Sequence, residues 1–180
     1  MATLVGPDDH SLEITVLRYE FDLAWLRANA TNTTADPDEW DANWLVVRVA
    51  GQAGALRWSV TRALFLTWDI SRLIGWLDAR LDDSASEQPD FSVMDPHFQI
   101  ETCGPADPSD IRVSFGYEFL PRNISRRIEM SITLSPGMDG IRRFASELRD
   151  ELQRFPIIAI ETNGTALRWL NTFGDPAQPS

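Results

Sequence analysis

The side chains best suited to acid–base or nucleophilic chemistry in this sequence are two histidines and one cysteine. Asp95 precedes His97 by two residues, a spacing at which a carboxylate could orient an imidazole as a base or metal ligand. Cys103 would need a nearby base and a lowered pKa to act as a nucleophile. No cluster with the spacing of metal ligands surrounds them. We therefore expect a turn histidine, a small packing cysteine, no structural metal and no cofactor, and we expect His10 to lie in a mobile N-terminal segment.

Paired carboxylates are the remaining route to catalysis, as in hydrolases. The chain holds 27 acidic residues, so some carboxylate pair always exists and its presence carries no information. The sequence contains no Gly-x-Gly-x-x-Gly, Walker A loop, nucleophile elbow or His-Glu-x-x-His motif. These observations predict a protein that is not an enzyme.

The densest group of acidic and aromatic side chains precedes the first predicted hairpin, and its acids are Asp36, Asp38, Glu39 and Asp41. A charge run is usually a solvated loop. It can also be a docking patch for a basic partner, where negative charge speeds encounter and sets specificity. Trp40 lies among these acids, and tryptophan is common both in interface hot spots and in cores. Both interpretations stay open for Trp40, whereas Trp44 and Trp58 are expected in the core.

The elements that must position these residues follow from periodicity. Alternating apolar and polar residues predict strands at 11–18, 44–49, 55–61, 111–119 and 127–134, with short strands near Phe91 and Phe98. Gly51 to Gly54 supplies the turn of the first hairpin. The strands at 111–119 and 127–134 are expected to form an antiparallel pair.

Two helices are predicted. Thr67 is the expected N-cap of the first, Asp69 lies in its first turn, and its apolar stripe is Ile70, Leu73, Ile74, Leu77 and Leu81. The second begins at Ser135-Pro136, ends before Pro156 and places these residues toward the core: Ile141, Phe144, Ala145, Leu148 and Leu152. The element order predicts an α+β fold: a mainly antiparallel twisted sheet of about six to seven strands with both helices packed on one face.

The length of 180 residues favours a single domain that spans residues 1–180, with a core at about 11–156. Residues 157–180 are expected to be a C-terminal appendage and tail, with a short strand at 157–160 and an amphipathic turn around Leu167, Trp169 and Leu170.

Composition narrows the partners and the compartment. The net charge of −11 repels phosphate backbones, so direct nucleic-acid binding is not expected. The first nine residues hold no basic residue and no long apolar run, which is unlike a signal peptide. A single cysteine allows no internal disulfide. We expect a cytoplasmic protein of bacterial type that does not bind a membrane.

A short motif carries a family resemblance. Glu39-Trp40-Asp41-Ala42-Asn43-Trp44-Leu45 resembles the Asp-Trp-Asp-Ala-Asn-Trp-Leu signature of the WapI family of bacterial immunity proteins. The junction Leu66–Asp69 and the helix that ends at Arg154-Phe155-Pro156 are also similar to that family. The resemblance covers about 11–156, while the stretch Ala28–Asp38 and the residues after Pro156 depart from it.

The resemblance implies a non-enzymatic immunity protein that binds and neutralises the basic toxic domain, a nuclease, of a secreted, contact-delivered toxin. The implied partner-binding residues are the four acids with Trp40 and Asn43. The alternative is an α+β domain that binds a small ligand, with tryptophans lining a pocket. A third interpretation, a hydrolase with paired carboxylates, has the least support.

Overall fold

The structure, a computed structural model, describes residues 1–22, 42–82, 90–93, 98–103, 109–116, 119–120, 129–160 and 167–170. Within them the elements follow in the order β1 (Ala2–Val5), β2 (Ser11–Tyr19), β3 (Trp44–Ala53), β4 (Leu56–Leu66), α3 (Thr67–Leu81), β5 (Phe91–Ser92), β6 (Phe98–Thr102), β7 (Ile111–Phe115), β8 (Met130–Leu134), α4 (Gly137–Arg154), β9 (Ile157–Ile160) and β10 (Leu167–Leu170).

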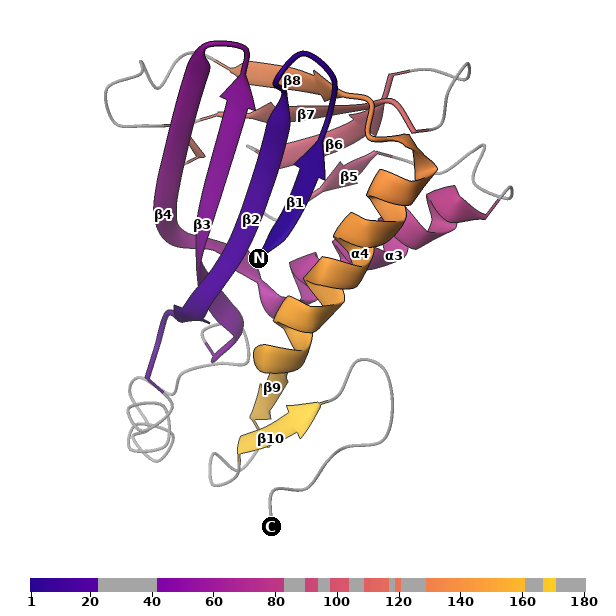
Figure 1. Ribbon diagram of the computed structural model, residues 1–180. Helices are drawn as coiled ribbons and strands as arrows, with labels where there is room; N and C mark the ends of the chain where they lie inside the picture. The colour runs from indigo at the N-terminus through magenta and orange to yellow at the C-terminus, as the bar shows by residue number, and fades with distance from the viewer. Residues whose placement is uncertain are drawn as a thin grey trace.

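The strands form two antiparallel four-stranded sheets, in the orders β1-β2-β3-β4 and β5-β6-β7-β8, and a two-stranded sheet of β9 and β10 (Figure 1). The α+β class is confirmed, but the prediction of one sheet with six to seven strands is wrong. The chain leaves β4 directly into α3 and begins the second sheet only after that helix. Alternation along a strand determines which side chains share a face, but it does not determine which strand lies beside it. The division into two sheets could therefore not be predicted from the sequence.

Aromatic side chains of β4 join the two sheets. The ring of Trp58 lies 5.0 Å from that of Phe115 on β7, and the ring of Phe65 lies 5.2 Å from that of Phe98 on β6. Trp58 also covers its register partner Gly51, where an added Cβ would come within 2.1 Å of the indole. A side chain at position 51 would therefore displace Trp58 from the second sheet. Trp58 is buried, as predicted.

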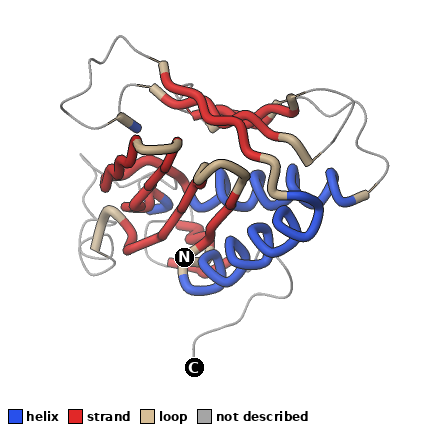
Figure 2. The backbone as a smooth tube through the Cα atoms, turned by 45° about the horizontal axis from the view of Figure 1, so that its top comes forward, coloured by secondary structure: helices blue, strands red, loops and turns tan. Residues whose placement is uncertain are grey.

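The helices α3 and α4 lie side by side, and α4 also runs along β1. Figure 2 shows the β5–β8 sheet above the helix pair. The buried apolar residues of both helices and both sheets form one cluster. The core predicted from helical spacing is confirmed for α4 and for most of α3, because Leu73, Leu77, Phe144 and Leu148 are all fully buried. Leu81 is only partly buried.

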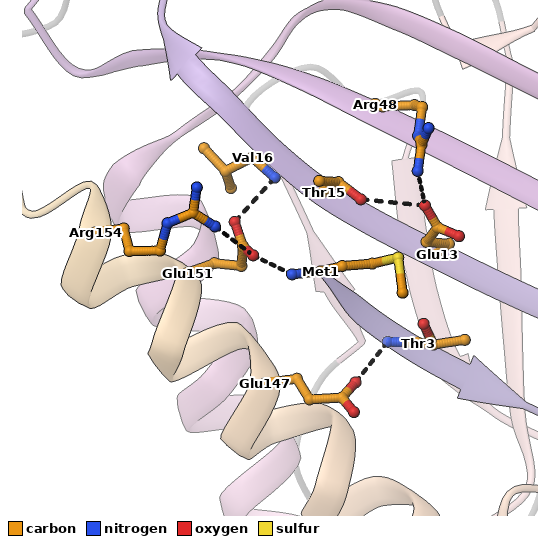
Figure 3. A network of polar contacts seen from close by, with 9 residues as sticks. All are labelled: Met1, Thr3, Glu13, Thr15, Val16, Arg48, Glu147, Glu151 and Arg154. Atoms are coloured by element: carbon orange, nitrogen blue, oxygen red, sulfur yellow. Dashed lines mark hydrogen bonds and ion pairs between the residues drawn. The ribbon is translucent and has the colours of Figure 1, made fainter.

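Polar contacts connect α4 to the first sheet (Figure 3). The carboxylate of Glu147 accepts the Thr3 backbone N–H at 2.7 Å. The buried carboxylate of Glu151 accepts the Val16 N–H at 3.2 Å and pairs with Arg154 and the Met1 ammonium. These acids satisfy backbone donors of β1 and β2 that face the helix, so they fix where α4 lies against the sheet.

The N-terminal segment differs from its prediction. β1 lies where no strand was expected, and its side chains Ala2 and Leu4 are fully buried. The ring of His10 lies 3.0 Å from the Thr133 carbonyl on β8, so His10 is held against the second sheet. The four residues of β1 were too few to show a period on their own.

Several ends of helices and strands also differ from those predicted. Thr67 is the first residue of α3 rather than its N-cap, and Gly137 rather than Pro136 is the first residue of α4. β7 ends at Phe115 and β8 begins at Met130, so each is shorter than predicted within the described residues, although their antiparallel pairing is confirmed. In the first hairpin, Gly51 belongs to β3, and the turn is Gly54-Ala55.

Candidate functional site

Asn43 is the described residue of the predicted partner-binding group, and it lies buried just before β3 with a relative exposure of 0%. Its side-chain Nδ2 donates to the Ile158 carbonyl at 2.6 Å. Its Oδ1 accepts the Ile158 N–H at 2.8 Å and the Thr67 hydroxyl at 2.7 Å. One amide thus joins the start of β3, the first turn of α3 and strand β9.

The two bonds to Ile158 have the pattern of a hydrogen-bonded pair in an antiparallel sheet. The Asn43 amide donates to the backbone carbonyl of Ile158 and accepts the backbone N–H of the same residue. Asn43 therefore takes the place of a strand at the edge of β9. In the same turn of α3, the carboxylate of Asp69 accepts the backbone N–H of Leu66, the N-cap residue, at 3.0 Å. An amide has no charge, so this cluster supplies position rather than acid–base chemistry.

The other predicted residues, Asp36, Asp38, Glu39, Trp40 and Asp41, lie outside the described residues. Described residues on either side of the segment that carries them lie close together. The N–H of Glu20 donates to the Trp44 carbonyl at 2.8 Å, so the chain leaves β2 and enters β3 at neighbouring points.

Tyr19 adds a second anchor at this end. Its hydroxyl donates to the Pro156 carbonyl, and its ring meets that of Phe155 edge-on with centroids 5.7 Å apart. Burial raises the pKa of Tyr19, so the hydroxyl stays protonated and keeps its donor role. The end of β2 is in this way attached to the chain that leads from α4 into β9.

Two predictions about single side chains at the ends of strands are wrong. Trp44 is only partly buried, although a core position was expected. Cys103 is exposed rather than packed. Both stand at the end of a strand, where the alternation that separates buried from exposed faces no longer constrains a side chain. His97 lies outside the described residues, and among those that are described no three His, Cys, Asp or Glu side chains gather as metal ligands would.

The sequence reasoning missed the partners of Asn43 and one charged residue of α3. Ile158 lies 115 residues away from Asn43, so no local pattern could pair them. The guanidinium of Arg80 lies 4.0 Å over the Trp76 ring, a contact that the i,i+4 spacing could have indicated. Burial lowers the pKa of Arg80, and the nearby charge of Asp90 acts in the opposite direction. Neither described helix is long and apolar enough to span a membrane.

Comparison with models of known protein families gives a match. A model of the immunity protein WapI-like family matches residues 3–156. No curated protein and no solved structure matches the chain. The match covers most of the sequence and includes Asn43, β3 and both helices, whereas it ends one residue before β9.

Proposed function

Because the chain belongs to the immunity protein WapI-like family, and membership indicates a toxin-immunity role, we propose that it binds the toxic domain of a secreted bacterial toxin and holds it inactive. The family match over residues 3–156 carries this proposal. The protein acts stoichiometrically, as a binding partner in the cytoplasm of the cell that it protects, and not as an enzyme.

The charge of the chain supports a basic nuclease domain as the target. The net charge is −11. A nuclease attracts a phosphate backbone with basic side chains around its substrate groove, and carboxylates of an inhibitor can meet the same side chains. The acidic segment, defined as Asp36, Asp38, Glu39, Trp40 and Asp41, is the proposed contact. The four acids steer the encounter, and Trp40 is the anchor.

The test is co-expression of the toxin domain encoded beside this gene with the parent protein and with a variant whose four acids are neutralised. A matched control removes the same number of exposed acids elsewhere on the described surface: Asp8→Asn, Asp9→Asn, Asp139→Asn and Asp150→Asn. We expect the parent and the control to protect, and the acidic-segment variant to associate more slowly with a flatter salt dependence.

Trp40→Ala is expected to cost at least about 2 kcal/mol of binding free energy. Trp58 is the appropriate contrast because it is buried, so its replacement should lower stability before it affects binding. Equal protection by the parent and the four-acid variant would remove the acidic segment from the mechanism. A parent that fails to protect against this toxin would contradict the immunity function itself.

A further inference from the structure

The last turn of α3 carries an arginine that the proposed function does not use. Arg80 is only 5% exposed, although arginine is rarely buried in proteins unless it is paired. Its Nε and Nη2 atoms are both buried, and within the described chain neither has a hydrogen-bond partner. A buried charged donor without an acceptor costs more free energy than a neutral one. These two donors therefore need an acceptor from outside the described chain.

The two atoms form one edge of the guanidinium group. The Nε–H bond and one Nη2–H bond point the same way in its plane, so together they can meet two oxygens of a carboxylate or phosphate group. The plane is held by Trp76, which lies one helical turn earlier, because the Cζ atom of Arg80 is 4.0 Å from the centroid of the indole. Trp76 is itself buried. The edge is thus oriented before a ligand binds.

Neighbouring described groups do not supply the acceptor. Arg72, two turns earlier at the same helical spacing, donates to the Ser92 carbonyl at 3.3 Å and lies over the Phe91 ring, so it serves β5. The charge of Asp90 acts on Arg80, yet the exposed Asp90 carboxylate accepts from neither Nε nor Nη2. Asp90 and the carbonyl end of α3 both repel an anion, so binding at this edge should be weak.

We propose that the Nε–Nη2 edge of Arg80 binds a small oxyanion, a free carboxylate or phosphate group, at the end of α3. The anion accepts both hydrogen bonds, while Trp76 holds the guanidinium plane. Access comes from the helix end, because the last turn of a helix frays and opens locally more readily than its centre. A small anion needs no toxin domain, so this site can be tested independently of the immunity function.

NMR titration of the full chain with sodium phosphate, and separately with sodium acetate, tests the site at constant ionic strength. We expect either anion to shift the Nε–H resonance of Arg80 and to saturate it in the millimolar range. The resonance of Arg143, an exposed arginine of α4, should shift much less. A response to only one of the two anions would identify the ligand as a phosphate or as a carboxylate group. An Arg80 resonance that shows no saturable shift with either anion would overturn the proposal.

Substitution of the arginine tests the paired donors. Arg80→Lys keeps the positive charge and loses the two parallel N–H bonds, so it should weaken phosphate affinity at least about tenfold. The affinity follows from the rise of the thermal midpoint with phosphate concentration. Arg143→Lys is the matched control, and it also corrects for the general stabilising effect of phosphate on folded proteins. Equal responses of the two variants would contradict a site at Arg80.

Asp90→Asn distinguishes a bound anion from an internal ion pair. If an anion is the acceptor, removal of the neighbouring negative charge should tighten phosphate binding about threefold and leave the anion-free protein as stable as the parent. If the carboxylate of Asp90 closes on Arg80 in solution, the same change would lower the thermal midpoint of the anion-free protein. That loss would overturn the proposal, because Asp90 would then be the acceptor of the guanidinium edge.

Discussion

The interior of the protein and the end where Asn43 lies are held together by different forces. In the interior, apolar side chains of both sheets and both helices form one cluster. Burial of apolar area is non-directional and scales with the area removed from water. At the other region, one buried amide and one partly buried phenol make hydrogen bonds with fixed geometry between distant segments. The interior therefore supplies most of the stability, and the polar end supplies orientation.

Leu77→Ala tests the interior and should have the largest effect. Leu77 is fully buried where α3 meets the core. Removing its side chain loses burial and leaves a cavity, which should lower the free energy of unfolding by about 2–5 kcal/mol in urea denaturation. Leu56→Ala is the matched control because that leucine is 45% exposed, and it should stay within about 0.5 kcal/mol of the parent. Equal losses in the two variants would contradict the helix register.

Asn43→Ala tests the polar end. The change leaves the N–H and carbonyl of Ile158 and the Thr67 hydroxyl without their buried partner. Each such group costs about 1–3 kcal/mol, and local relaxation recovers part, so we expect a total loss of about 3 kcal/mol. Thr67→Val should lose about 1 kcal/mol, since only one of the three bonds is removed. A loss below that of Thr67→Val would show that water replaces the amide.

Glu151→Gln probes the boundary between the two regions, where α4 meets β2. The carboxylate is 2% exposed and accepts from Val16 and Arg154. Glutamine keeps one acceptor and loses the charge, so the expected loss is about 1–2 kcal/mol by denaturation. Asp139→Asn is the control, because Asp139 is 97% exposed and its pair with Arg142 is screened by water. No change in either variant would mean that α4 is placed by apolar packing alone.

The interior was largely predictable because its signals are local. The spacing of Leu73, Leu77, Phe144 and Leu148 identifies one face of each helix within a few turns of chain. Alternation in β2, β7 and β8 does the same for strands. The separation into two sheets was not predictable, because Trp58 and Phe65 carry no sign in the sequence that they face a second sheet rather than a helix.

At the polar end, the sequence predicted the separate elements but not the contact between them. The motif around Asn43 indicated the family, and Asn43 itself was expected to be a partner-binding residue. Its partner Ile158 belongs to a strand that was predicted from its own apolar run, yet nothing local connects the two. A buried polar contact over such a separation has no period, and for that reason the structure is needed to find it.

Tyr19→Phe is expected to have the smallest effect, and it depends on pH. Burial raises the pKa of the Tyr19 hydroxyl in the folded protein, whereas in the unfolded chain it ionises at about pH 10. The hydroxyl's contribution to stability is therefore complete below that pH. Above that pH the contribution declines, because only the unfolded state loses the hydroxyl proton. At pH 7 the variant should lose about 1 kcal/mol with the bond to Pro156.

Above about pH 10, the difference in unfolding free energy between Tyr19→Phe and the parent should narrow. Urea denaturation on both sides of that pH measures it. Phe155→Leu is the control, since it removes the ring that packs on Tyr19 and leaves the phenol. Its difference from the parent should show no such narrowing. A Tyr19→Phe difference that stays constant across the range would mean that the phenol ionises equally in both states. The attachment of β2 to the chain beyond α4 would then rest on ring packing and not on the hydrogen bond.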